Sequence, residues 1–135
     1  MENETKLNGV SILLFRIMLS GIFVVAGISH LLHPHGVTQR ITDAKNADFA
    51  RLFGDPHALG IWSGYALILF GMTFLLGIYT RWSAVILFVM LIPITITIQM
   101  GNGWMHGPLW KNIAIFGALL FFIFNNIKQY SLYNK

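Results

Sequence analysis

Four long apolar stretches constrain the fold of this chain more than any other feature. They cover residues 10–32, 56–79, 82–100 and 108–126, and each is close to the roughly 20 residues that an α-helix needs to cross a bilayer. Only 10% of the 135 residues are charged, against about 25% in a typical soluble domain. The sequence therefore predicts an all-α membrane protein in one domain over residues 1–135, folded as a bundle of four transmembrane helices.

Local sequence features predict where the second stretch begins and what structure precedes it. Asp55 is a good N-cap before Pro56, a residue type favoured in the first helical turn. Between the first and second stretches, residues 36–55 carry apolar residues at helical spacing, which predicts short helices lying on the membrane surface. These apolar residues are Val37, Ile41, Ala44, Phe49, Leu52 and Phe53.

Small and polar residues inside the stretches predict contacts between helices. Gly60 and Gly64 form a GxxxG pair, a pattern that lets two membrane helices pack closely. In the third stretch, Thr95 and Gln99 share a helical face and can form interhelical hydrogen bonds, whereas Thr97 is expected to face elsewhere.

Composition excludes several classes of function. The chain has no cysteine, which rules out disulfide relays and thiolate metal sites. Its nine Lys and Arg residues are scattered singly, so no basic stripe suits a nucleic acid. The acidic residues Glu2 and Glu4 near the start do not resemble the positive region of a signal peptide, and we expect the first stretch to be a retained span.

The basic residues also predict an orientation. Four spans place both termini on one side, and residues 36–55 on the other, which we call the loop side. Five basic residues belong to the terminal side and four to the loop side, and the positive-inside rule then places both termini in the cytoplasm of a bacterial inner (plasma) membrane. The five are Lys6, Arg16, Arg81, Lys128 and Lys135, and the four are Arg40, Lys45, Arg51 and Lys111.

All five histidines fall on the loop side: His30, His33, His35, His57 and His106. His30 and His33 are three positions apart and share a helical face, and His57 and His106 are candidates to approach from other helices. Imidazoles bind zinc, copper and iron, so one hypothesis is a haem or divalent metal site. We favour the alternative, that these histidines are polar residues at a membrane interface, because no spacing matches a strong metal motif such as HExxH.

Three basic residues in the spans form a second candidate site, which we call the basic seam: Arg16, His30 and Lys111. Arg16 and His30 are 14 positions apart and share a face of one helix, separated by about 21 Å. Lys111 is predicted to point into the bundle along a face that continues through Ala114 and Ala118, and its alternative role is an interfacial anchor.

A bundle interior with basic residues and no acidic residue in any span suits an anionic or carbonyl-bearing ligand. Examples are a quinone head, a lipid phosphate or the carboxylate of a partner. Three carboxylates of the loop are candidates to neutralise this charge: Asp43, Asp48 and Asp55.

An ordered set of motifs resembles the DoxX family of small four-span membrane proteins. They are LLFRIMLSGIFVVAGISHLLHP in the first stretch, LGIWSGYALILFGMTFLLGIYTRWSA across the second and third, and HGPLWKNIAIFGALLFF at the fourth. The resemblance implies a four-helix bundle associated with redox systems, since relatives include a subunit of a thiosulfate:quinone oxidoreductase. Arg16, Trp110, Lys111 and Asn112 match the family pattern, whereas the position of His30 is often lysine. The predicted ligand-binding set is therefore Arg16, His30, Lys111, Trp110 and Asn112.

The favoured hypothesis is an inner-membrane subunit or accessory of a redox system that binds a quinone. Lys111 or His30 would hydrogen-bond the quinone carbonyl, and an aromatic residue such as Phe23, Trp62 or Trp110 would flank its ring. The chain has no complete hydride-transfer or hydrolytic machinery, so any oxidoreductase activity requires a partner that supplies electrons. Expected partners are the lipid bilayer and either a membrane redox protein or further copies of the chain.

Three alternatives stay open: a non-enzymatic scaffold or assembly factor, a histidine-based metal or haem protein, and an oligomeric small transporter. No inverted repeat supports the transporter.

Overall fold

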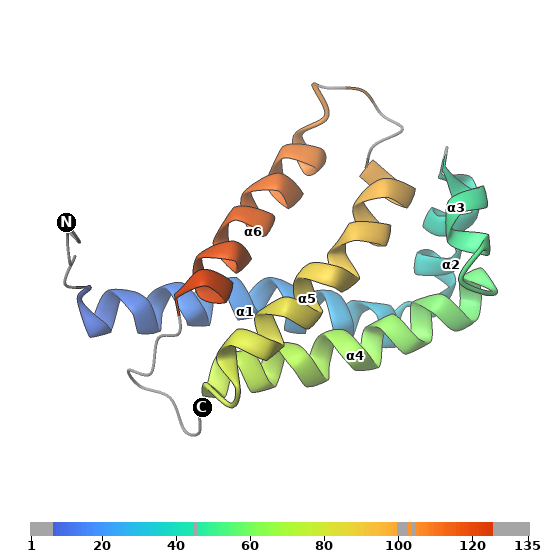
Figure 1. The fold of residues 1–135 in the computed structure, drawn as a ribbon. Helices are drawn as coiled ribbons and strands as arrows, with labels where there is room; N and C mark the ends of the chain where they lie inside the picture. The colour runs from blue at the N-terminus through green and yellow to red at the C-terminus, as the bar shows by residue number, and fades with distance from the viewer. Residues whose placement is uncertain (1–6, 45, 100–102, 104, 126–135) are drawn as a thin grey trace.

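The computed structural model describes residues 7–44, 46–99, 103 and 105–125. Its helices are α1 (Gly9–Leu32), α2 (Pro34–Asp43), α3 (Ala47–Arg51), α4 (Pro56–Leu76), α5 (Thr80–Ile94), the π-helix η1 (Thr95–Gln99) and α6 (Gly107–Phe124). Four helical segments are long and apolar enough to cross a membrane, namely α1, α4, α5 with η1 as far as Ile98, and α6. The prediction of an all-α bundle with four spans is confirmed, and the chain is a multi-pass membrane protein (Figure 1).

The helix ends follow from local chemistry. The Asp55 side chain accepts a hydrogen bond from the Ala58 backbone N–H at 3.3 Å, as expected of an N-cap. α4 ends at Leu76, earlier than the predicted 79, because Gly77 adopts a left-handed conformation with φ of 77°. Such a residue is a common helix stop. The chain then turns through Tyr79 and enters α5 at Thr80.

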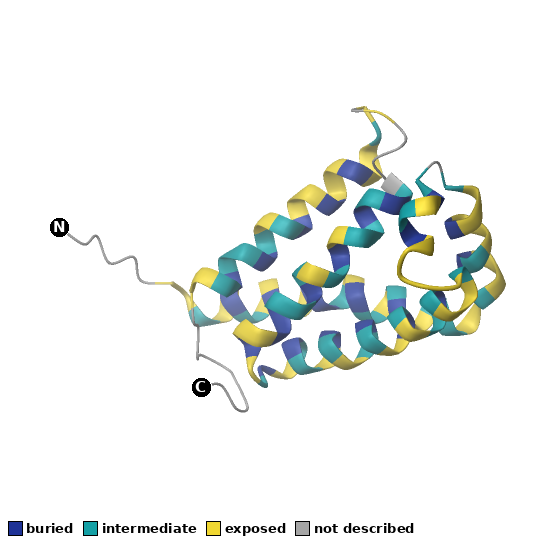
Figure 2. Cartoon of the chain, turned by 45° about the vertical axis from the view of Figure 1, so that its right-hand side comes forward, coloured by how far each residue is buried: buried dark blue, intermediate teal, exposed yellow. Residues whose placement is uncertain are grey.

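The four spans are arranged as two pairs. α1 packs along α4, and α6 packs along α5. The pairs come together at the end where α4 turns into α5, and they separate toward the opposite end, where α2 and α3 lie (Figure 1). Residues that are buried lie on the facing sides of the helices, and exposed residues lie on the outside (Figure 2). The space between the separated pairs is where a site can form.

Glycines set the close approach of α1 to α4. A Cβ atom added at Gly27 would lie 2.7 Å from the Gly64 carbonyl oxygen, and one at Gly64 would lie 2.9 Å from the His30 Cβ. Gly60 and Gly64 are both buried. The predicted close packing at the GxxxG pair is therefore confirmed, and Gly27 is its counterpart on α1.

The third span changes its helical type after a proline. Pro93 lies inside α5, and the π-helix η1 begins two residues later. Thr95 and Thr97 are both buried, although Thr97 was expected to lie on a different face from Thr95. A π-turn is wider than an α-turn, and it therefore shifts the residues that follow Pro93 off the α-helical face. The Gln99 side chain lies outside the described residues.

The segment between α1 and α4 covers the separated end of the bundle. Val37 and Ile41 of α2 and Ala50 of α3 form a small buried cluster, against which Leu59 and Ile98 pack. Leu52 and Phe53, which belong to the apolar residues of this segment, are exposed. The segment thus buries Val37, Ile41 and Ala50 against Leu59 of α4 and Ile98 of η1, and its position on the membrane surface stays a prediction.

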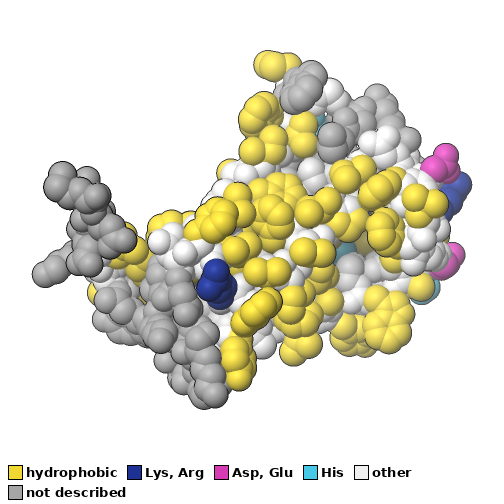
Figure 3. Space-filling model, in the orientation of Figure 1, with side chains coloured by type: hydrophobic (Ala, Val, Ile, Leu, Met, Phe, Trp, Pro, Cys, Tyr) yellow, Lys and Arg dark blue, Asp and Glu magenta, His cyan; other side chains and the backbone are white. Residues whose placement is uncertain are grey.

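The surface has the distribution expected of a membrane protein. Figure 3 shows hydrophobic side chains over the middle of the molecule, acidic and basic side chains at the end that carries α2 and α3, and a further basic side chain toward the opposite end. Water is absent from the bilayer core, so charged groups collect where the helices leave it.

Candidate functional site

A cavity of about 350 Å³ lies between the two helix pairs at the loop side, under α2. Its wall is mostly apolar, with Phe23 from α1, Leu67 from α4 and Leu91 from α5 among the lining residues. Six polar side chains also line it, and they come from five different helices: His30, Arg40, Ser63, Thr97, Lys111 and Asn112. An apolar pocket with a few convergent polar groups is the usual form of a small-molecule site.

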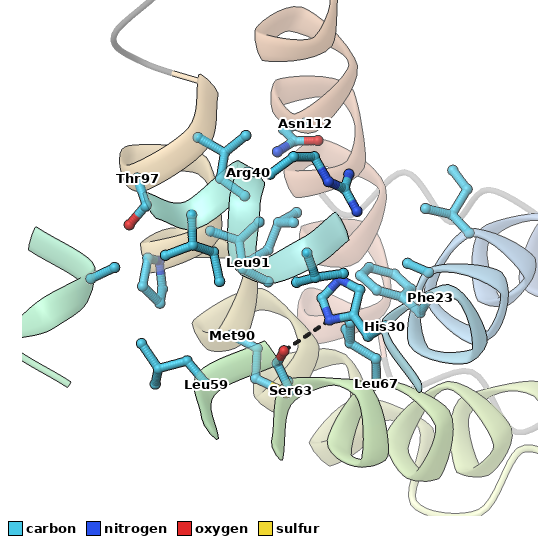
Figure 4. A pocket seen from close by; sticks show the side chains of 18 of the residues that line it. Phe23, His30, Arg40, Leu59, Ser63, Leu67, Met90, Leu91, Thr97 and Asn112 are labelled. Carbon is cyan, nitrogen blue, oxygen red and sulfur yellow. Dashed lines mark hydrogen bonds between the residues drawn. The ribbon is translucent and has the colours of Figure 1, made fainter. Parts of the chain in front are cut away.

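His30 is held in a defined orientation at the α1–α4 contact. Its Nδ1 lies 3.2 Å from the Gly60 carbonyl oxygen and 3.0 Å from the Ser63 hydroxyl. A carbonyl can only accept, so a hydrogen bond to Gly60 places the proton on Nδ1. In Figure 4 the other ring nitrogen, Nε2, lies on the side of the ring toward Arg40. Neutral His30 therefore offers an acceptor at this atom, and the protonated ring offers a donor.

Three basic side chains line the cavity: His30, Arg40 and Lys111. Among the described residues, the cavity wall contains no carboxylate. The positive charge is therefore available to a ligand.

The carboxylates of the loop are engaged elsewhere. Asp43 accepts a hydrogen bond from Gln39 at 2.6 Å, Asp48 pairs with Arg51 at 3.2 Å, and Asp55 caps α4. The expectation that these three residues neutralise the basic groups of the site is therefore wrong, because each is held by its own segment.

Asn112 joins α6 to the third span. Its side chain is 3% exposed, and its Nδ2 donates to the Thr95 hydroxyl at 3.0 Å. Thr95 in turn donates to the Leu91 carbonyl at 2.8 Å. The predicted interhelical role of Thr95 is confirmed, and the bond places the first turns of α6 against η1.

Lys111 lies at the edge of the cavity, and its residue is exposed overall. The buried face of α6 runs through Leu109, Asn112, Ile115, Leu119 and Phe122. Ala114 is exposed, so the prediction that the face of Lys111 and Ala114 points into the bundle is wrong. The larger apolar side chains of α6 fill the core, and this rotation places Lys111 at the boundary between the cavity and the outside.

Arg16 and Trp110 lie outside the cavity wall. The Arg16 residue is 1% exposed and belongs to the buried face of α1, so it is a core residue toward the terminal side. Trp110 is 51% exposed on the outside of α6. The structure thus brings together His30, Lys111 and Asn112 from the predicted set, but not Arg16 or Trp110.

Three polar residues of the cavity wall were not predicted as site residues: Arg40, Ser63 and Thr97. Arg40 lies over the end of the bundle because α2 places it there. It lies between Val37 and Ile41, which are both buried, and this position next to the apolar face of α2 is the sequence feature that indicated it. Of the aromatic residues expected to flank a ligand, Phe23 lines the cavity and Trp62 is exposed on α4.

The histidines do not gather into a metal site. The described residues contain no group of three or more histidine, aspartate or glutamate side chains placed to hold a metal ion. His57 instead lies 3.3 Å from the Thr38 hydroxyl through its Nδ1, and its ring stacks on His35 with the ring centres 6.2 Å apart. His33 follows the last residue of α1 and is exposed, and His106 precedes α6. The geometry of this part of the chain gives no support to the metal hypothesis.

Comparison with known proteins identifies one family. The family model described as DoxX matches residues 11–100. No curated protein and no solved structure matches the chain.

Proposed function

Because the chain belongs to the DoxX family, we propose that it is an integral-membrane subunit or accessory of a redox system and that its cavity binds a quinone. The family membership supports a membrane protein of the kind often associated with redox systems. The quinone is inferred from the cavity itself.

The observation that carries this proposal is the chemistry of the cavity wall. A quinone has a flat apolar ring, two carbonyl acceptors and a hydrocarbon tail. Lys111 and Arg40 line the cavity, and both can donate hydrogen bonds to a carbonyl. Phe23 supplies an aromatic surface for the ring. His30, held through its Nδ1, presents Nε2 as an acceptor for the hydroxyl of the reduced form.

The chain supplies binding groups but no redox centre of its own. It has no cysteine, and its cavity wall combines basic and neutral polar groups. Reduction of a quinone to a quinol takes two electrons and two protons, and we infer that a membrane partner protein supplies the electrons. A homo-oligomer is the alternative assembly.

We also propose that the protein lies in a bacterial inner membrane with both termini in the cytoplasm. The beginning of α1 and the end of α6 lie at the same end of the bundle (Figure 1). The basic residues, five on this side and four on the loop side in the full sequence, support a cytoplasmic location for it.

The test is direct binding of decylubiquinone to the purified, detergent-solubilised protein. We expect Lys111→Ala to weaken the affinity about tenfold, since a hydrogen bond from a charged donor contributes about 1.5–3 kcal/mol and 1.4 kcal/mol is a factor of about ten in Kd. Arg81→Ala is the matched control, because it removes an exposed basic residue at the opposite end of the bundle.

Native mass spectrometry of protein released gently from its own membrane complements this measurement. An added mass that matches a quinone supports the proposal. A wild-type protein that binds no decylubiquinone, or a Lys111→Ala protein that binds it as wild type does, overturns the quinone assignment. A bare chain bound only to another protein favours the scaffold alternative.

A further inference from the structure

A second hollow, of about 630 Å³, lies beside the cavity on the outer side of α1, and we call it the α1 groove. Six of its lining residues belong to one side of α1: Met18, Gly21, Ile22, Val25, Ala26 and Ser29. The others are the three basic residues His30, Arg40 and Lys111. Lys111 is the fifth residue of α6, so the groove lies between α1 and the beginning of α6.

The groove exists because α1 and α6 meet at only one end. At the closed end, Phe15 of α1 packs on Phe121 and Phe122 of α6, with ring centres 5.7 and 5.1 Å apart. Toward the loop side the two helices separate, since α1 follows α4 and α6 follows α5. The gap is therefore not filled by either helix pair.

The groove is continuous with the cavity. Five residues line both: Ile22, Ala26, His30, Arg40 and Lys111. The outer part of the groove is apolar and open, with Met18 70% exposed and Val25 66% exposed. Both residues lie within the membrane-spanning helix α1, so this part faces the hydrocarbon of the bilayer. The basic groups are confined to the inner end, where the groove joins the cavity.

We propose that the α1 groove is a lateral entrance from the bilayer and holds the hydrocarbon tail of the ligand whose head occupies the cavity. This inference rests on the proposed function. The cavity is near the lower limit of ligand pockets, roughly 300–1,000 Å³, and it suits a single ring but not a ring with a long tail. The occupant is an amphiphile with a hydrogen-bonding head and one tail, because the basic residues lie where the two hollows meet and the remaining wall of the groove, apart from Ser29, is apolar.

The test introduces a large side chain into the groove and leaves its basic residues unchanged. A Cβ atom at Gly21 would have no neighbouring atom within 4 Å, so the first side-chain atom of Gly21→Phe has open space, and the ring extends into the groove. Gly117 of α6 has the same open surroundings and lines neither hollow, which makes Gly117→Phe the matched control. Two probes are compared by equilibrium binding: decylubiquinone, which has a tail, and 2,3-dimethoxy-5-methyl-1,4-benzoquinone, which does not.

We expect Gly21→Phe to raise the Kd of decylubiquinone about tenfold and to leave the Kd of the tail-less quinone unchanged, while Gly117→Phe changes neither. Equal affinity of wild type and Gly21→Phe for decylubiquinone overturns the entrance and leaves the proposed function intact. If Gly21→Phe binds neither probe while Gly117→Phe binds both, the tail assignment is overturned, because the groove then belongs to the head site. Wild-type protein that binds neither probe overturns the proposed function itself.

A second variant distinguishes a filled groove from a folding defect of Gly21→Phe. Val25→Trp narrows the same groove from an exposed position on α1, and it is expected to act as Gly21→Phe does. If either variant instead dissociates a bound protein or a second copy of the chain and leaves decylubiquinone affinity unchanged, the groove is a protein interface and the entrance is overturned.

Discussion

The two ends of the bundle are built from the same four spans but meet in different ways. At the closed end, Phe74 and Phe122 pack edge to face with ring centres 4.9 Å apart, and the Thr73 and Ser83 hydroxyls are hydrogen-bonded at 2.8 Å across the α4–α5 turn. At the loop side the pairs separate, and α2 closes part of the space with Val37 and Ile41. One end is filled by large side chains, and the other retains a cavity with basic groups on its wall. The difference indicates that the closed end supports the fold and the open end is where a ligand has room.

The largest expected effect tests the closed end. Phe74→Ala removes a fully buried ring, and we expect it to lower the free energy of unfolding by about 3–5 kcal/mol, as for other buried aromatic residues. The matched control is Phe124→Ala, because Phe124 is 74% exposed. Thermal unfolding in detergent, followed by circular dichroism, measures both variants. Equal stabilities of the two variants contradict a packed closed end.

The next largest effect is expected at the close contact between α1 and α4. Gly27→Ala places a Cβ atom 2.7 Å from the Gly64 carbonyl oxygen, and the backbone must move to relieve this clash. We expect a loss of about 1–3 kcal/mol, typical of overpacking, and weaker quinone binding because His30 lies on the same contact. Gly117→Ala, in open surroundings, is the control. If Gly27→Ala is as stable as the wild type in the same unfolding assay, the close α1–α4 contact is contradicted.

The smallest expected effect concerns the hydrogen bond that joins α6 to the third span at the open end. Asn112 and Thr95 form a buried interhelical hydrogen bond, and such bonds average about 0.6 kcal/mol in membrane proteins, with a maximum of about 1.7 kcal/mol. A double-mutant cycle with Asn112→Ala and Thr95→Val is expected to give a coupling energy in this range. Additive effects of the two changes indicate that the bond does not hold α6 against η1.

Features that depend on short segments were predictable from the sequence. The four spans follow from the length of the apolar stretches, and the beginning of α4 follows from Asp55 and Pro56. The GxxxG pair predicted close packing, because a glycine removes the side chain wherever it meets another helix. His30 and Lys111 were correctly recognised as basic residues of the loop side, and the structure places both at one cavity.

The rotation of each helix was not predictable in the same way. Lys111 and Asn112 are adjacent in sequence, and they point in directions about 100° apart because an α-helix has 3.6 residues per turn. In a span that is apolar on all sides, the periodicity does not show which direction faces the bundle. The prediction chose the face of Lys111 and Ala114, whereas packing against α5 buries the face of Asn112 and Ile115.

By itself, the sequence determined that this protein crosses a membrane four times, that α4 begins at Pro56, and which residues carry charge. Only the tertiary structure decided which of those charges meet. Arg40 reaches His30 and Lys111 at the cavity because α2 folds back over the bundle end, and Arg16 is left in the core because its part of α1 lies toward the closed end. Hydropathy and capping act over a few residues, whereas a cavity arises from how whole helices diverge, and that depends on contacts between residues far apart in the chain.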